Sequence, residues 1–253
     1  MEDHIRPDLP SKCTWSLNTT LPSPHRPSKP TCNEEIKPTI LHAIGNTPIV
    51  RLNKIPKSAG LKCEILAKCE YMNPGGSLKD RVILRMVEEA EDKGILKPGS
   101  TLIEPSSGNT AQSLALVAAI KGYECIIVMP KRMSEEKEMA VRALGARVVR
   151  TTNDYAYDAP GGLFDTVQKL HREIPSSVVL NQFKNADNPL AHYYSTGPEI
   201  LKQCNGKVDM FVMGAGTGGA LTGIARYLRE HCPNIRIVGV DPDGSHLAEP
   251  PEL

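Results

Sequence analysis

Short apolar runs alternate with longer segments of helical spacing along most of the chain. The expected strands cover 64–68, 101–104, 125–129, 147–151, 178–181, 208–213 and 235–240. The expected helices cover 78–94, 109–121, 134–145, 162–173, 188–204 and 218–231. The strand runs are continuously apolar rather than alternating, which is typical of parallel strands covered on both faces. The pattern therefore predicts an α/β fold built on parallel sheets.

The first 37 or so residues differ from everything that follows. They show no helical or strand period and are rich in Ser and Thr, with prolines at positions 7, 10, 22, 24, 27 and 30. Such a segment forms an extended arm or a small irregular module. We therefore separate an N-terminal segment, 1–37, from a folded domain over 38–253.

The expected helix at 78–94 carries a lysine on its apolar side. Lys79 shares a face with five apolar residues at three- and four-residue spacing, namely Val82, Ile83, Met86, Val87 and Ala90. Ser77 is placed as the N-cap, and Asp80 would complete a capping box. A lysine is rarely buried without a partner. Lys79 therefore either extends to the edge of the core, which the helix alone favours, or has a chemical task there.

Composition and charge narrow the function classes. The 30 Lys and Arg residues against 29 Asp and Glu give a net charge of +1, with no basic block, so a nucleic-acid surface is not indicated. The longest apolar run, 114–120, is far below the roughly 20 residues that span a bilayer. The acidic N-terminus does not resemble a signal peptide, and seven scattered cysteines fit reduced thiols. We expect a cytoplasmic protein that binds no membrane.

A polar turn follows the expected strand at 101–104. Residues 105–110 read Pro-Ser-Ser-Gly-Asn-Thr and lead directly into an apolar helix. Hydroxyls, an amide and free backbone N–H groups gather there at a helix N-terminus, where the dipole favours an anion. Ordinary helix capping explains the same residues, and from this turn alone it is the favoured interpretation.

A glycine-rich loop, 214–219, follows the expected strand at 208–213. It reads Gly-Ala-Gly-Thr-Gly-Gly and precedes a helix, which is typical of a phosphate site. Gly214, Gly216 and Gly219 also satisfy the dinucleotide pattern, with Asp241 placed as a ribose-binding acid. A nucleotide-dependent oxidoreductase and a tight turn without a ligand both remain open from this loop alone.

The three features are less ambiguous together than apart. An inward lysine, an anion-binding turn and a phosphate loop are what a phosphorylated aldehyde cofactor and an amino-acid carboxylate require. A dinucleotide enzyme accounts only for the loop at 214–219. The combination favours pyridoxal phosphate.

The chain resembles the fold-type II pyridoxal-phosphate enzymes, which share the tryptophan-synthase-β fold, and within them the haem-containing cystathionine β-synthase family. Beyond the three features, the resemblance rests on 44–48, 67–70, 122–130, 142–146, 188–193 and 241–245. It implies an α/β catalytic domain with parallel sheets in two lobes, the smaller at about 78–190.

The resemblance also implies roles for individual residues. Lys79 would bind the cofactor covalently and act as the base at the substrate Cα, and Asn109 would contact the phenolic oxygen of the cofactor. The phosphate would be bound by Gly216, Thr217, Gly218, Gly219 and Ala220. The substrate carboxylate would be bound by Ser106, Ser107, Gly108, Thr110 and Gln182. The implied reaction joins L-serine and L-homocysteine to give cystathionine and water, and cysteine as donor would release hydrogen sulfide.

The N-terminal segment carries its own resemblance, over 12–15 and 23–25. It implies that Cys13 and His25 are axial ligands of a haem iron and that Arg226 pairs with the thiolate. Without the resemblance, a lone Cys and a lone His in a proline-rich stretch would indicate nothing.

Four features depart from the family pattern. The sequence ends at Leu253, where the family continues for more than a hundred residues, so we expect a domain that is incomplete at its C-terminus. Phe183 replaces an active-site tyrosine, Ala111 a glycine, and Ala220 a phosphate-binding threonine. These departures keep open a catalytically inactive homologue that retains haem binding or subunit contacts. A homodimer or larger assembly would require the full-length surface.

Overall fold

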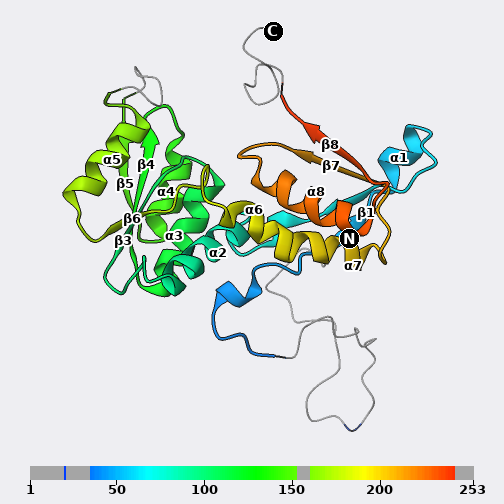
Figure 1. Cartoon of the computed structure of the whole chain (residues 1–253), viewed down its shortest axis with the longest axis horizontal. Helices are drawn as coiled ribbons and strands as arrows, with labels where there is room; N and C mark the ends of the chain where they lie inside the picture. The colour runs from blue at the N-terminus through cyan, green and yellow to red at the C-terminus, as the bar shows by residue number, and fades with distance from the viewer. Residues whose placement is uncertain (1–19, 21–34, 153–159, 243–253) are drawn as a thin grey trace, which may run out of the picture. The chain divides into compact units, whose positions relative to one another are not determined.

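The structure is a computed structural model that describes residues 20, 35–152 and 160–242. The chain divides into two units, 1–36 and 37–253, and the description below concerns the second. Cys13 and His25 lie outside the described residues. Figure 1 shows the strands of the second unit in three sheets, of which the smallest is the antiparallel pair β1 (Ile49–Arg51) and β2 (Leu66–Lys68).

The largest sheet is parallel and covered on both faces. Its strands run in the order β5-β4-β3-β6, with bounds β3 Thr101–Pro105, β4 Glu124–Pro130, β5 Arg147–Thr151 and β6 Ser177–Val179. Leu102 belongs to the core with the helices α2, α3 (Asn109–Lys121) and α4 (Glu135–Ala143), whereas Ile103 belongs to the core under α5 (Leu163–Glu173). Successive side chains thus pack into the cores on opposite faces of the sheet, which confirms the predicted parallel sheet.

The order of the strands creates a switch point beside β3. The chain adds β4 and β5 on one side of β3 and then crosses to place β6 on the other side. In open α/β sheets, ligands bind outside the carboxyl ends of the strands at such a point. The turns that follow β3 and β6 are therefore the expected place for a site.

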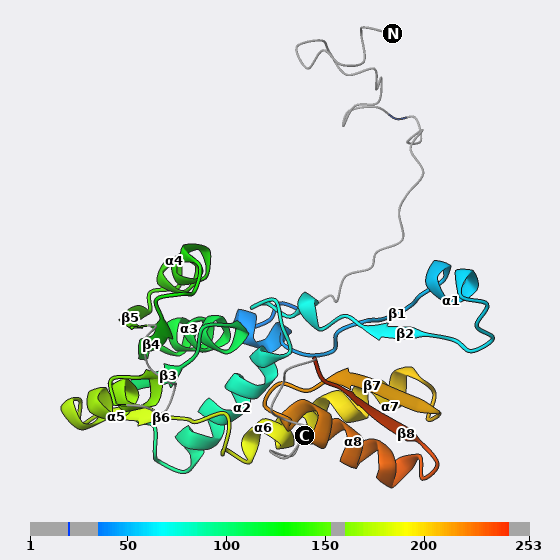
Figure 2. The same ribbon diagram turned by 90° about the horizontal axis from the view of Figure 1, so that it is seen from above.

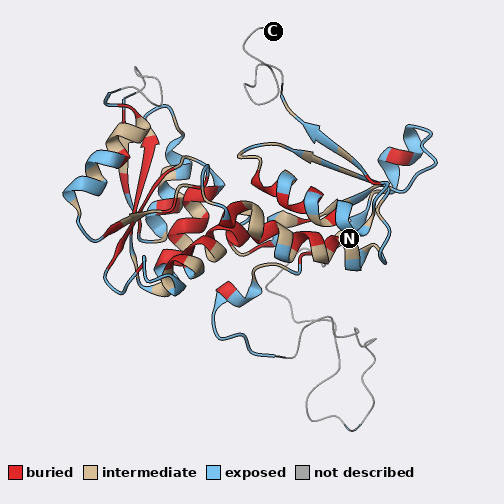
Figure 3. Ribbon diagram, viewed as in Figure 1, coloured by how far each residue is buried: buried red, intermediate tan, exposed pale blue. Residues whose placement is uncertain are grey.

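Among the described residues, the third sheet is covered on one face. It pairs β7 (Met210–Gly214) with β8 (Arg236–Val240) in parallel, and its inner side chains pack in a core with α8 (Gly219–His231). Its outer side chains, among them Val212 and Val238, are exposed (Figure 3). The expectation of coverage on both faces is wrong here, because the apolar run at 208–213 alone does not reveal how many layers pack on it. The antiparallel β1–β2 pair is an additional small sheet that the sequence pattern did not predict.

Two helices lie between the larger sheets. Figure 2 shows α2 (Lys79–Asp92) and α6 (Asp187–Ala191) side by side; α2 also packs on α3, and α6 packs on α8. The apolar face predicted for α2 is confirmed, since Val82 and Ile83 are fully buried. The start of α2 therefore lies where both sheets can contribute loops.

The helix predicted over 188–204 is confirmed as a helical segment over 187–203, with one π-helical turn inside it. The chain forms α6, a π-helical turn at His192–Thr196 (η4) and then α7 (Gly197–Gln203). Pro198 lies in the first turn of α7 and lacks the N–H that a continuous helix would need there. The π-helical turn widens one turn of the helix, a local change that the spacing over 188–204 does not reveal.

Four short elements were not predicted, namely the strand β1, the helix α1 (Lys54–Ser58) and the 3₁₀ turns η2 (Ile40–Ala43) and η3 (Glu70–Met72). Segments of three to five residues contain too few positions for a period to show. Within the described part of the chain, no helix has the length and apolar character needed to cross a membrane.

Candidate active site

Lys79 is the first residue of α2 and is held there by its neighbours. Its backbone N–H donates to Ser77 Oγ at 3.2 Å. The Asp80 carboxylate accepts hydrogen bonds from the Gly75 N–H and from Ser113 Oγ, both at 2.5 Å. The predicted capping box is therefore wrong in both halves, because Leu78 and not Ser77 is the N-cap of α2, and Asp80 binds Gly75 instead of Ser77. A Cβ at Gly75 would lie 2.3 Å from Asp80 Oδ1, so only glycine allows this approach.

The Lys79 amine is a poorly paired, half-buried base. Burial lowers its pKa, and the nearby charge of Glu104 opposes this shift only in part. Its Nζ donates to Thr217 Oγ1 at a long 3.5 Å. A lysine with a lowered pKa has a larger neutral fraction, and the neutral amine is the nucleophile.

Glu104, near the carboxyl end of β3, is fully buried. Its two oxygens accept the backbone N–H groups of Asn181, at 3.3 Å, and Gln182, at 3.4 Å. Burial raises the pKa of Glu104 to about 7, although these two N–H groups and the charge of Lys79 act in the opposite direction. The carboxyl group therefore changes its charge near neutral pH.

The anion-binding turn lies at the switch point, as the sheet order leads us to expect. Ser106, Ser107, Gly108 and Gln182 line one pocket of about 290 Å³, together with Phe183 and six further residues. Thr110 is buried outside this lining, and its hydroxyl donates to Gln182 Oε1 at 2.8 Å. All five predicted carboxylate-binding residues are thus brought together. We expect the N-terminus of α3 to supply the positive end of its dipole there.

The glycine-rich loop has room for a ligand. A Cβ built at Gly216 or Gly218 would meet no atom within 4 Å, and Gly218 has the left-handed φ of +79°. Gly219 is packed instead, because a Cβ there would lie 2.2 Å from Asn188 Oδ1. Ala220 is buried in the first turn of α8 and has only backbone groups to offer a phosphate.

Asn188 joins the glycine-rich loop to the pocket. Its Nδ2 donates to the backbone oxygen of Gln182 and to Thr217 Oγ1, both at 2.8 Å, while its buried Oδ1 has no partner among the described residues. Through Thr217, this relay reaches Lys79. The three loops that the sequence singled out are therefore connected. The predicted cofactor residue Asn109 stands apart, because it is exposed at the start of α3 and its side chain has no hydrogen bond among the described residues.

Sequence reasoning missed Glu104 and Asn188 as site residues. A signal existed for Glu104, since an acidic residue ended an otherwise apolar buried strand. Asn188 gave no such signal, because it lay in a segment expected to form an ordinary helix. Its role depends on Gln182 and Thr217, which approach it only in the folded chain.

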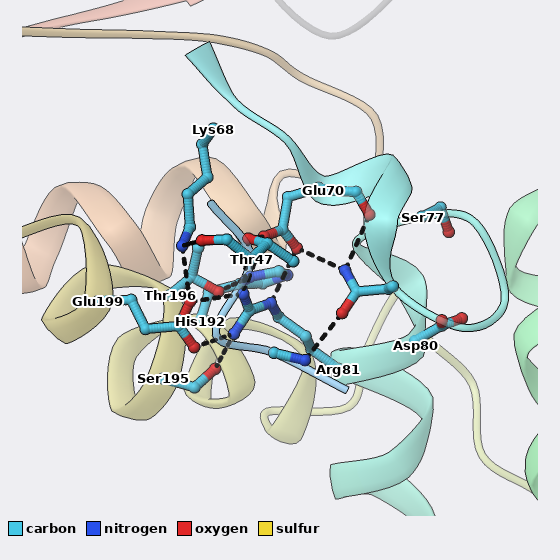
Figure 4. Close-up of polar contacts among 12 residues, drawn as sticks. Thr47, Lys68, Glu70, Ser77, Asp80, Arg81, His192, Ser195, Thr196 and Glu199 are labelled. Carbon is cyan, nitrogen blue, oxygen red and sulfur yellow. Dashed lines mark hydrogen bonds and ion pairs between the residues drawn. The ribbon is translucent and has the colours of Figure 1, made fainter. Parts of the chain in front are cut away.

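A buried charge cluster surrounds Arg81, two residues beyond Lys79 (Figure 4). The guanidinium group binds both oxygens of Glu70, at 2.8 Å each, and both oxygens of Glu199, at 2.6 and 2.8 Å. Burial acts to raise the pKa of Glu199, but hydrogen bonds from Arg81 and Lys68 lower it to about 2. The cluster therefore ties the start of α2 to η3 and α7.

His192 lies beside this cluster in Figure 4 and is fully buried. Burial, with the positive charge of Arg81, lowers its pKa to about 4, so the ring is neutral at physiological pH. Nδ1 lies 2.9 Å from the Thr196 hydroxyl, and Nε2 has no partner among the described residues.

Arg226 lies in the second half of α8. Its side chain is 74% exposed, pairs with Glu230 at 3.4 Å and lies over the Tyr193 ring. Because its predicted thiolate partner Cys13 is outside the described residues, that pairing stays a prediction. The described part of the chain contains no group of three or more His, Cys, Asp or Glu residues suited to a metal ion.

Comparison with known proteins gives a family for this arrangement. The family model described as pyridoxal-phosphate dependent enzyme matches residues 40–250. The chain belongs to the pyridoxal-phosphate dependent enzyme family. The family assignment confirms the expected fold and cofactor class, and it favours the cofactor-lysine interpretation over the dinucleotide one.

Individual members of the pyridoxal-phosphate dependent enzyme family resemble the chain closely. Cystathionine beta-synthase of Rattus norvegicus is 59% identical over 98% of this chain and 45% of its own length. Cysteine synthase B of Pseudomonas aeruginosa is 45% identical over 83% of this chain and 69% of its own length. The solved structure of a hydrogen sulfide-producing enzyme from Fusobacterium nucleatum superposes with a TM-score of 0.79 and 40% identity, covering 85% of this chain and 68% of that one. The chain spans about half the length of the cystathionine beta-synthases it matches.

Proposed function

We propose that this chain carries the catalytic machinery of a β-replacement lyase that joins L-serine and L-homocysteine to give cystathionine and water. With cysteine as the donor, the same machinery would release hydrogen sulfide. The names of the similar proteins support both reactions, since they include cystathionine beta-synthases and a hydrogen sulfide-producing enzyme.

The residues present fit pyridoxal phosphate. The glycine-rich loop is open at Gly216 and Gly218, and Lys79 beside Thr217 has a lowered pKa. Pyridoxal phosphate supplies an aldehyde that condenses with amines and a conjugated ring that accepts the electron pair released at the substrate Cα. In this proposal the backbone N–H groups of 216–219 bind the phosphate, and Asn109 turns toward the phenolic oxygen.

The chain's own residues divide the remaining work. Ser106, Ser107 and Thr110 hold the substrate carboxylate at the N-terminus of α3, with Gln182 fixing the Thr110 hydroxyl. Lys79 Nζ accepts the Cα proton and later returns it. The serine hydroxyl leaves as water with one added proton, and the thiol sulfur of the second substrate bonds to Cβ in its place.

The observation that carries the proposal is the relay from Lys79 through Thr217, Asn188 and Gln182 to Thr110. It joins a nucleophile, a phosphate loop and a carboxylate turn in one connected site. If these loops only stabilised the fold, the amine of Lys79 would not need a lowered pKa.

The test is a turnover assay on the purified chain, supplied with pyridoxal phosphate, serine and homocysteine. We expect cystathionine to form and Lys79→Ala to abolish it, while Lys169→Ala, at an exposed position on α5, keeps it. Cofactor bound at Lys79 without any product from either donor would instead establish the catalytically inactive homologue.

We also propose haem as a second cofactor, with Cys13 and His25 as its axial ligands. The support is the resemblance of 12–15 and 23–25, together with the accessible guanidinium group of Arg226. An intense haem absorbance band that shifts in Cys13→Ser and in His25→Ala is the expected result. Haem binding that both variants leave unchanged would refute this ligand pair.

We further propose that the protein acts on free amino acids in the cytoplasm, without a membrane or nucleic-acid partner, and that it forms a homodimer or larger assembly where the full-length surface is present. Light scattering after size-exclusion chromatography checks the assembly, and fractionation of cells that express the protein checks its location. A strict monomer, or a membrane-bound fraction, would contradict the respective part.

A further inference from the structure

Glu104 is a buried carboxyl group that the proposed reaction leaves without a task. It is 0% exposed, and its hydrogen-bond partners are two consecutive backbone N–H groups at 3.3 and 3.4 Å. Both distances lie beyond the usual range for a charge-assisted hydrogen bond. The fold therefore keeps a carboxyl group in its core that its partners stabilise only weakly.

The two N–H groups belong to the turn from which the pocket is built. Asn181 has the left-handed φ of 54°, which costs energy in a residue other than glycine. This conformation aims its N–H and that of Gln182 at the same carboxyl group, an arrangement that binds anions. The next contacts of Gln182 are the Thr110 hydroxyl and the Asn188 amide. Glu104 thus holds the residue on which the relay depends.

Lys79 is the cation whose charge acts on Glu104. On the neighbouring strand β4, Cys125 is affected by Glu104 as well, but burial raises its pKa to about 12 and it remains a neutral thiol. His192, which is affected by Lys79, is also neutral at pH 7. The electrostatic effect of Glu104 on titratable groups is therefore concentrated on the Lys79 amine.

We propose that Glu104 is a positioning residue, whose buried carboxylate holds the Asn181–Gln182 turn in the shape that the substrate carboxylate needs. Its charge also acts on the Lys79 amine. The role of Glu104 rests on the proposed function only in that Lys79 is taken to bind the cofactor. Its effects on the turn and on the amine exist before any cofactor binds.

The test compares Glu104→Gln with the unchanged protein, without added cofactor. Glu173→Gln serves as the matched control, because it makes the same change at an exposed position at the end of α5. Acetylation of Lys79 by acetic anhydride is followed from pH 6 to 10 by peptide mapping, with the exposed Lys169 as the internal reference. We expect the Lys79 profile to move to lower pH in Glu104→Gln and to stay in place in Glu173→Gln. An unmoved profile would overturn the electrostatic part.

Urea unfolding of the same proteins tests whether the buried charge is a cost to the fold. The folded pKa of Glu104 is about 7 against 4.5 for an ordinary glutamate, so the native state binds the proton more tightly. Stability is therefore lost as the pH rises through this interval and stays lower above it. Glu104→Gln lacks this penalty. We therefore expect the urea midpoint of Glu104→Gln to exceed that of the unchanged protein by more at pH 8 than at pH 5. Failure of the variant to fold would contradict the inference.

The substrate side is tested on the cofactor-loaded enzyme. We expect Glu104→Gln to raise the KM for serine about tenfold or more, because the amide group places its own N–H beside one of the two backbone N–H groups. An unchanged KM would overturn the role at the turn. Failure of the unchanged protein to attach cofactor at Lys79 would refute the proposed function, while the acetylation and unfolding results on Glu104 would still stand or fall by themselves.

Discussion

Two charged side chains lie close together at the start of α2, the buried Arg81 and the half-buried Lys79, and they differ in how far they are paired. Arg81 is bound by four carboxylate oxygens from Glu70 and Glu199, and the pKa of Glu199 is about 2. Lys79 and Glu104 affect one another through space, yet burial shifts the pKa of each toward its neutral form. Fully paired buried charges fix architecture, whereas weakly paired ones are typical of sites of chemistry.

Breaking the paired cluster gives the largest expected effect. Arg81→Leu leaves Glu70 without its cation and Glu199 with Lys68 alone, so we expect a loss of about 3–5 kcal/mol in the free energy of unfolding. Urea denaturation measures it. Arg226→Leu is the control, because that side chain is 74% exposed and its loss should cost within about 0.5 kcal/mol. A loss below about 1 kcal/mol for Arg81→Leu would show that the cluster is not structural.

The relay through Asn188 comes next in size. Asn188→Ala removes two hydrogen bonds and leaves the Gln182 oxygen without its donor, at a cost of about 1–3 kcal/mol in the free energy of unfolding. We also expect weaker binding of pyridoxal phosphate, followed by its visible absorbance during titration. Asn53→Ala, an exposed position at the start of α1, should change neither quantity. Unaltered cofactor affinity in Asn188→Ala would mean that cofactor binding at the glycine-rich loop does not depend on the hydrogen bonds of Asn188.

Much of the large sheet was predictable, because its information is local. The runs at 101–104 and 125–129 are apolar on both faces, and such runs identify parallel strands whatever surrounds them. The helix at 188–204 was predictable from its spacing, but the π-helical turn inside it at 192–196 was not, because it changes only one turn. The packing of β7 and β8 on one face depends on which helices lie against them. The residues of the strands themselves do not show this.

The residues of the candidate site also fall into those that the sequence predicted and those that it did not. Lys79, the turn at 105–110 and the loop at 214–219 were found because each is a local motif with a physical signature. Glu104 and Asn188 were missed because their importance comes from Gln182, which is far from Glu104 in sequence and adjacent to it in the fold. Local patterns identify the groups that touch a ligand, whereas the groups that hold those residues in place emerge only from the fold.

The weakly paired amine gives a prediction of opposite sign to that for Arg81. Because the pKa of Lys79 is lowered in the folded state, the unfolded chain binds its proton more tightly, and burial of the charged amine is a cost at neutral pH. Lys79→Met should therefore be at least as stable as the unchanged protein at pH 7. Its advantage should shrink as the pH rises toward the ordinary lysine value of about 10.4. Urea midpoints at pH 7 and pH 10 test this, and a variant destabilised at pH 7 would mean that Lys79 is a paired, structural residue.

The smallest expected effect concerns the support of the Gly75–Asp80 loop. Ser113→Ala removes one donor to the buried Asp80 carboxylate, whose pKa burial already raises. We expect a loss of about 1 kcal/mol in the free energy of unfolding at pH 7. The loss should fall at acid pH, where Asp80 is protonated. A loss independent of pH would indicate a packing effect of the hydroxyl instead.

The central claim is that Lys79 is the cofactor-binding amine. It is tested most directly by reducing the protein with sodium borohydride after pyridoxal phosphate has been added and mapping the labelled peptide. The account predicts one cofactor-labelled residue, Lys79, and loss of that label in Lys79→Ala. Label fixed to Lys68 or to any other lysine, with Lys79 unmodified, would contradict it.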